Sequence, residues 1–170
     1  MVKGSAKPAG NTAARSTAAS STADREIVIT RLIDAPRELL FRAWTDPTQV
    51  GKWWGPTGFT TTTHEMNVKP GGAWRFIMHG PDGTDYDNEI LYLEVVKPER
   101  LVYDHGEPGK PGYFKVWITF AEEAGKTRLT LRSLFETAAA RDYVVREHKA
   151  IDGGNQTLDR FEAHVAALRP

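Results

Sequence analysis

Alternating apolar and polar residues mark a series of strands along most of the chain. Ile27, Ile29 and Ile33 give the first strand, predicted over residues 25–33. After residue 58 the alternation returns in segments that end at turns rich in glycine and proline, which is typical of antiparallel hairpins. These segments are residues 60–68, 73–79, 86–96, 100–105, 113–120 and 127–135, with a loop predicted over 106–112. The pattern predicts an antiparallel meander.

Two short helices are predicted between the first strand and this meander. Asp34 can cap the first helix and Pro36 suits its first turn, and the apolar residues that follow recur at helical spacing. A second helical turn contains Trp53 and Trp54. Adjacent side chains on one short helix point in different directions, so we expect one of these tryptophans to be buried and the other to be partly exposed.

The C-terminal part of the chain is predicted to be helical. A first segment covers residues 138–148, and a second, amphipathic segment follows Gly153 and Gly154. The apolar face of the second segment consists of Leu158, Phe161, Val165 and Leu168. Each glycine costs about 1 kcal/mol relative to alanine inside a helix. Either the helix breaks at these glycines or a close neighbour requires the space.

The final helix must bury its apolar face, and one side of the sheet is the only surface large enough. Alternation places Trp74, Phe76 and Met78 on that side. The predicted fold is α+β of the helix-grip type. It consists of a curved antiparallel sheet, two short helices after the first strand, and a long C-terminal helix over a cavity.

The N-terminal segment differs in composition from the remainder of the chain. Alanine, serine and threonine dominate it, and no large apolar residue follows Val2. Such a segment cannot recover the entropy that is lost on ordering. We expect a disordered tail over residues 1–24 and one helix-grip domain over residues 25–170.

Composition and charge exclude several classes of function. Lysine plus arginine and aspartate plus glutamate both total 22, so no overall field attracts nucleic acid or an anionic membrane. No apolar run reaches the roughly 18 residues of a membrane-spanning helix, and no membrane insertion is expected. Cysteine is absent, which excludes disulfides and fits a reducing compartment. We expect a cytoplasmic protein, monomeric or homodimeric.

No motif for catalysis or metal binding stands out. The five histidines are scattered, and none has the two-histidine spacing of a helical zinc site. The acidic stretch 82–89 lacks the glycine and the terminal carboxylate of a calcium loop. We expect no metal and no cofactor, and the sequence favours a binding protein over an enzyme.

Six short segments, in a fixed order, resemble one family. They are Asp34-Ala35-Pro36-Arg37, Ala43-Trp44-Thr45-Asp46-Pro47, Trp53-Trp54-Gly55-Pro56, Lys69-Pro70-Gly71-Gly72, Pro98-Glu99-Arg100-Leu101-Val102 and Asn155-Gln156-Thr157-Leu158-Asp159-Arg160. Together they resemble the START-like, or SRPBCC, superfamily, whose helix-grip fold is also that of the birch-pollen allergen. Within it they resemble the domain named after the activator of the heat-shock-protein-90 ATPase.

The resemblance implies a cavity between the sheet and the final helix, which in various relatives binds lipids, hormones or polyketides. It implies no single reaction. In the eukaryotic activator this domain follows a separate chaperone-binding domain, whereas here a tail of about two dozen residues stands in that place. The resemblance therefore argues against chaperone activation, and a chaperone is kept only as an alternative partner. Many relatives carry tryptophan at the entry to the last helix, where this chain has Gly153 and Gly154. These glycines are expected to open volume at one end of the cavity.

Aromatic and thioether side chains are the main candidates for the cavity lining, with a few polar groups to orient a ligand. Core packing is the alternative role for each large apolar residue. The predicted lining is Trp53, Trp54, Phe59, His64, Met66, Trp74, Phe76, Met78, Tyr86, Asn88, Tyr103, His105, Gly154, Leu158 and Phe161. Alternation does not decide which face of the sheet Asn88 occupies.

The leading hypothesis is binding of a hydrophobic or aromatic small molecule, lipid- or polyketide-like, between the sheet and the C-terminal helix. A cyclase- or hydrolase-like enzyme in the same cavity is one alternative, and it predicts a buried ionisable group that faces the cavity. A chaperone-associated interaction protein is another, and it predicts an exposed apolar patch near Trp117. We expect Gly154→Trp to weaken ligand binding and to leave the fold intact.

Overall fold

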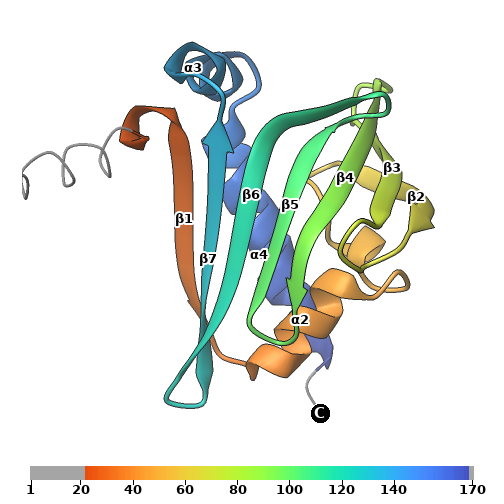
Figure 1. The fold of residues 1–170 in the computed structure, drawn as a ribbon. Coiled ribbons are helices and arrows are strands. Elements are labelled where there is room, and N and C mark those ends of the chain that lie inside the picture. Colours follow the sequence, from red (N-terminus) through yellow and green to blue (C-terminus); the bar gives the residue numbers. More distant parts are fainter. Residues whose placement is uncertain (1–21, 169–170) are drawn as a thin grey trace, which may run out of the picture.

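A seven-stranded sheet wraps around one long helix (Figure 1). The computed structural model describes residues 22–168. Most of the predicted tail lies outside these residues, but Ala23–Arg25 already forms a short 3₁₀ helix, η1. The other elements are β1 (Glu26–Ile33), α2 (Arg37–Thr45), η2 (Val50–Lys52), β2 (Thr60–Met66), β3 (Ala73–His79), β4 (Asp85–Val96), β5 (Arg100–Glu107), β6 (Lys110–Glu123), β7 (Lys126–Phe135), α3 (Ala138–Glu147) and α4 (Ala150–Leu168).

The strands pair antiparallel throughout, in the order β1-β7-β6-β5-β4-β3-β2. Phe76 of β3 is opposite Asn88 of β4, so Asn88 shares the concave face with this buried phenylalanine. Glu89 lies on the outer face, where it accepts a hydrogen bond from Nε of Arg75 at 2.8 Å. With α4 lying across the concave face, the predicted helix-grip fold is confirmed.

The hairpin between β5 and β6 is longer than the sequence predicts. Residues 106–112 do not form a loop, because β5 continues to Glu107, which pairs with Lys110. Gly109 closes the short turn with a φ of 79°, a conformation that glycine adopts without strain. The strand register shifts at three points, which are Thr63/Glu65, Tyr92/Glu94 and His105/Glu107. Such bulges increase the local twist and so help the long strands to curve.

Aromatic side chains fill one half of the space between the sheet and α4. Trp53 and Trp54 are both buried, and the ring of Trp53 lies 4.7 Å from that of Trp44 and 4.6 Å from that of Phe161. The expectation that one of the two adjacent tryptophans is partly exposed is therefore wrong. The reason is that η2 ends before them, so they do not share the surface of one helix.

Two helix ends differ from the prediction. Pro36, not Asp34, occupies the N-cap position of α2, because its extended backbone (φ −69°, ψ 145°) places it just outside the helix. Leu168 belongs to the apolar face of α4 by spacing, yet it is exposed at the last position of the helix. The buried face ends at Val165.

α4 is continuous through Gly153 and Gly154, and the chain turns instead at Lys149, whose φ is 49°. A Cβ atom on Gly154 would lie 2.7 Å from Cδ1 of Ile29, and one on Gly153 would lie 3.3 Å from Cγ of Pro56. The glycines therefore allow close approach and do not open volume. A tryptophan at Gly154 would require the end of the Ile29 side chain to shift, because even a Cβ atom lies within 2.7 Å of Cδ1 of Ile29.

We predict that the effect of Gly154→Ala depends on Ile29. In the wild type, the gain of about 1 kcal/mol in helix propensity is offset by the overlap with Cδ1 of Ile29, so the free energy of unfolding stays unchanged or falls. In an Ile29→Val background, which lacks that carbon, the same substitution should stabilise the protein. Urea unfolding of the four proteins in a double-mutant cycle measures this coupling, and equal effects in both backgrounds would contradict it.

Candidate ligand-binding cavity

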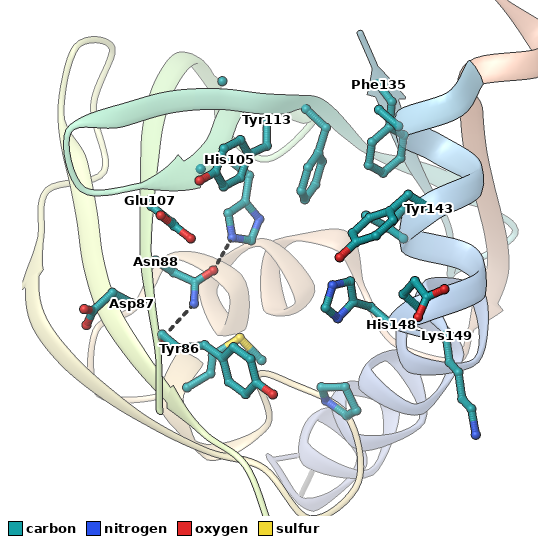
Figure 2. Close-up of a pocket in the computed structure, with 18 of the residues that line it drawn as sticks. Tyr86, Asp87, Asn88, His105, Glu107, Tyr113, Phe135, Tyr143, His148 and Lys149 are labelled. Carbon is teal, nitrogen blue, oxygen red and sulfur yellow. Dashed lines mark hydrogen bonds between the residues drawn. The ribbon is translucent and has the colours of Figure 1, made fainter. Parts of the chain in front are cut away.

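A cavity of about 1160 Å³ opens where the sheet meets α3. We call it the mouth cavity (Figure 2). Strand ends of β3 to β7 and the loop before β2 line one side, and α3 with its turn into α4 lines the other. The apolar and aromatic lining consists of Pro56, Phe59, Met78, Tyr86, Tyr113, Phe114, Phe135, Ala140, Tyr143 and Val144. This volume is sufficient for a drug-sized molecule.

The mouth cavity exists because α3 spans the end of the sheet without filling the space behind it. None of the residues 138–147 is buried. Thr137 caps the helix, accepting a hydrogen bond from the backbone N–H of Ala140 at 3.0 Å. The turn at Lys149 then directs the chain into α4. The short side chains of Ala140 and Val144 line the cavity, so the space stays open.

One polar pair lies among the aromatic walls. Nε2 of His105 is 2.8 Å from Oδ1 of Asn88, and Nδ2 of Asn88 donates to the carbonyl oxygen of Tyr86 at 2.9 Å. Figure 2 shows both side chains pointing into the cavity, with Tyr143 and His148 on the opposite wall. Because ligand sites in proteins are mostly apolar with a few placed polar groups, this pair is suited to orient a bound molecule.

Burial among rings keeps His105 neutral. The rings of Phe114 and Phe76 lie 4.8 and 6.0 Å from its imidazole. Desolvation lowers the pKa of His105 from 6.5 to about 4, because an apolar environment disfavours the charged form. The ring is therefore uncharged at neutral pH.

The structure brings five of the predicted lining residues to the mouth cavity: Phe59, Met78, Tyr86, Asn88 and His105. Seven others belong to the buried core that fills the other half of the space between the sheet and α4: Trp53, Trp54, Trp74, Phe76, Tyr103, Leu158 and Phe161. Met66 packs partly buried against that core, and His64 is exposed on β2. Gly154 lies against β1.

The wall formed by α3 was not predicted from the sequence. It contributes Tyr143, Val144 and His148 to the cavity. The signal in the sequence was the apolar group Tyr143, Val144 and Val145 in a short helical segment, and the structure shows that no residue of this helix is buried. Apolar side chains on a helix without a core contact indicate a surface that a ligand or partner covers.

Arg160 holds the loop at residues 54–57, which borders the cavity at Pro56. Its Nη1 lies 3.3, 2.8 and 3.1 Å from the carbonyl oxygens of Trp54, Gly55 and Pro56. In addition, Oε1 of Gln156 accepts a hydrogen bond from the backbone N–H of Thr57 at 3.2 Å. Two of the six sequence segments therefore meet in space, and their contact positions Pro56 at the cavity.

Carboxylates outnumber cations around the mouth cavity. The charged lining residues are Asp85, Asp87, Glu107, Glu136, Glu147 and Lys149. Asp85 is 2.6 Å from Nδ1 of His79, and Glu147 is 3.1 Å from Nε of Arg146. The remaining carboxylates still exceed the single lysine, so the local potential is negative.

Three further observations bear on other functions. No group of three His, Asp or Glu side chains within residues 22–168 is arranged to hold a metal ion. The helices of this same part of the chain include none that is long and apolar enough to cross a membrane. Trp117 is half-buried, and the guanidinium carbon of Arg132 lies 4.4 Å from its ring centroid and covers one face of the ring.

Fold and cavity together define a helix-grip protein with an open end. The family model described as "Activator of Hsp90 ATPase homolog 1-like protein" matches residues 34–166, and the chain belongs to this family. Its members commonly bind ligands. No curated protein matches the chain.

Solved structures of bacterial proteins share the fold. A protein from Mycobacterium smegmatis is 25% identical with a TM-score of 0.76, covering 88% of this chain and 96% of its own. One from Arthrobacter aurescens is 24% identical with a TM-score of 0.79 and coverages of 86% and 89%. One from Nitrosomonas europaea is 22% identical with a TM-score of 0.77 and coverages of 85% and 96%. Similarity at this level of identity shows the fold.

We predict that His105 makes the protein less stable in acid. Its pKa is about 4 in the folded protein and near 6.5 when unfolded, so between these values only the unfolded chain takes up the proton. The part of the free energy of unfolding that depends on neutral His105 is fully present above pH 6.5. It falls by up to roughly 3 kcal/mol as the pH falls towards 4. Unfolding of wild type and His105→Phe across this range measures it, and parallel pH profiles would contradict the prediction.

We predict that Arg160→Met loosens the loop at residues 54–57. The substitution keeps an apolar stem but removes the donor to three carbonyl oxygens, which should lower the free energy of unfolding by about 1–3 kcal/mol. Amide exchange at Phe59, whose N–H donates to the carbonyl of Pro56, should become faster. Arg146→Met, at an exposed position of α3, is the control. An equal effect of both substitutions would argue against a role of Arg160 in holding the loop.

Proposed function

We propose that this protein is a cytoplasmic binding protein for a hydrophobic or aromatic small molecule, lipid- or polyketide-like, and that the mouth cavity is its site. The main support is an open volume of about 1160 Å³ with aromatic walls around the polar pair of His105 and Asn88. This combination is typical of small-molecule sites. Ligand binding is also common in the family.

The exposure of aromatic side chains supports the same site. Tyr86, Tyr113 and Tyr143 are 43%, 47% and 51% exposed, and all three line the mouth cavity. Large amphipathic rings offer a ligand both apolar area and a hydroxyl group. Exposed aromatic rings that surround one opening indicate a surface that a bound ligand covers.

A second candidate is catalysis in the same cavity, since the imidazole of His105 faces it and is unprotonated at neutral pH. Its lowered pKa makes it a weaker base than an exposed histidine. Mass spectrometry of a compound recovered after incubation with the protein separates the two functions. A change in the mass of the compound that occurs with the wild type and not with His105→Phe would indicate an enzyme. An unchanged mass indicates binding alone.

We predict that Ala140→Trp blocks the mouth cavity. Ala140 lines it, whereas its neighbour Ala139 is exposed and does not, so Ala139→Trp is a matched control on the same helix. Titration with the uncharged fluorescent probe N-phenyl-α-naphthylamine should show binding to wild type and to the control, and a loss of about tenfold or more in affinity for Ala140→Trp. No binding to the wild type by this probe or by other uncharged aromatic compounds, or equal binding to both variants, would refute the proposed site.

A further inference from the structure

The hydrogen bonds of Asn88 determine which nitrogen of His105 carries the proton. Nδ2 of Asn88 donates to the carbonyl oxygen of Tyr86 at 2.9 Å, so the atom facing His105 is Oδ1, at 2.8 Å from Nε2. An amide oxygen only accepts hydrogen bonds, so Nε2 is the donor. In the neutral ring the other nitrogen, Nδ1, is then an acceptor.

The lone pair of Nδ1 has no donor within the described part of the chain. The bond to Asn88 is the hydrogen bond that His105 makes there. Its other neighbours are rings, with Trp54, Tyr103 and Phe114 at centroid distances of 6.4, 6.4 and 4.8 Å. In this part of the chain, the buried side-chain atoms without a partner are Nε of Arg37 and Nε of Arg100, so Nδ1 of His105 is open to the cavity and can accept a hydrogen bond there. In Figure 2 the imidazole points into the cavity, from which a ligand can supply that donor.

We propose that the ligand is an uncharged aromatic molecule with a hydroxyl or N–H group, and that Nδ1 of His105 accepts the hydrogen bond from this group. The inference rests on the proposed function, because it names the ligand class for the same cavity. His105 then contacts the ligand, and Asn88 is a positioning residue that holds the ring in the required tautomer. The aromatic walls, including Phe59, Tyr86 and Phe114, supply the apolar contact.

The charges around the opening disfavour an anionic ligand. Asp87, Glu107 and Glu136 line the same cavity as His105, and among residues 22–168 Lys149 is the one lysine or arginine in the lining. A carboxylate or phosphate group would approach these side chains within the distance over which charges act at physiological salt. It would also lack the proton that Nδ1 accepts. A fatty acid or a phospholipid is therefore a poor fit, whereas a phenol or an aromatic N–H compound is a good one.

Three probes of nearly the same size test the inference on the full chain: β-naphthol, its methyl ether, and β-naphthoate, which is ionised at neutral pH. Calorimetric titration should give an affinity for naphthol about tenfold higher than for the ether, as expected for one hydrogen bond, and naphthoate should bind more weakly than the ether. In His105→Phe the ether should keep its affinity and the advantage of naphthol should disappear.

Nitrogen NMR of the His105 ring gives a readout that does not depend on any variant. The free protein should show the tautomer with the proton on Nε2, and the Nδ1 resonance should move when naphthol is added but not when the ether is added. A proton on Nδ1, or equal affinities for naphthol and its ether, would overturn the inference and leave the proposed function standing. Absence of binding by both neutral compounds would overturn the proposed function as well.

Discussion

The close packing of α4 on the concave face of the sheet is the contact on which the other features of this protein depend. Leu158, Phe161 and Val165 are buried there, and Arg31 of β1 ties the polar side of the helix to the sheet through Asp159 and Glu162, at 2.6 and 3.1 Å. Because both kinds of contact act along the same helix, its distance from β1 is fixed within narrow limits.

The mouth cavity is a consequence of this packing. Glycines at the start of α4 bring the helix against Ile29 and Pro56. The preceding helix, α3, crosses the end of the sheet with no buried residue. The space between α4 and the sheet is therefore closely packed on one side and open on the other. Trp44, Trp53, Trp54 and Trp74 belong to the core that fills the tight half, and the mouth cavity lies in the half beneath α3.

The sequence predicted the parts of the fold that depend on local periodicity. Strand β3 has the predicted ends, Ala73 and His79, because alternation and flanking turns determine a strand directly. Trp53, Trp54 and Gly154 were assigned to the cavity but lie in the core or against β1. Their environment is decided by contacts distant in sequence, such as Phe161 and Ile29, which periodicity does not encode. The position of α3 could not be predicted for a similar reason. A helix without a buried apolar face shows no periodicity that indicates which surface it packs against.

His105 marks where the requirements of stability and of binding differ. In the core nearby, the indole N–H of Trp53 donates to the carbonyl oxygen of Ala43 at 3.0 Å and that of Trp74 donates to Oγ1 of Thr63 at 3.1 Å. The imidazole of His105 pairs one of its two nitrogens within the described chain. An apolar ring at this position would avoid the proton uptake that favours unfolding in acid. Departures from the most stable choice are expected at functional sites. The acceptor nitrogen of His105 that no protein donor reaches within the described chain faces the open volume, which is why the specificity of the site is best sought at this side chain.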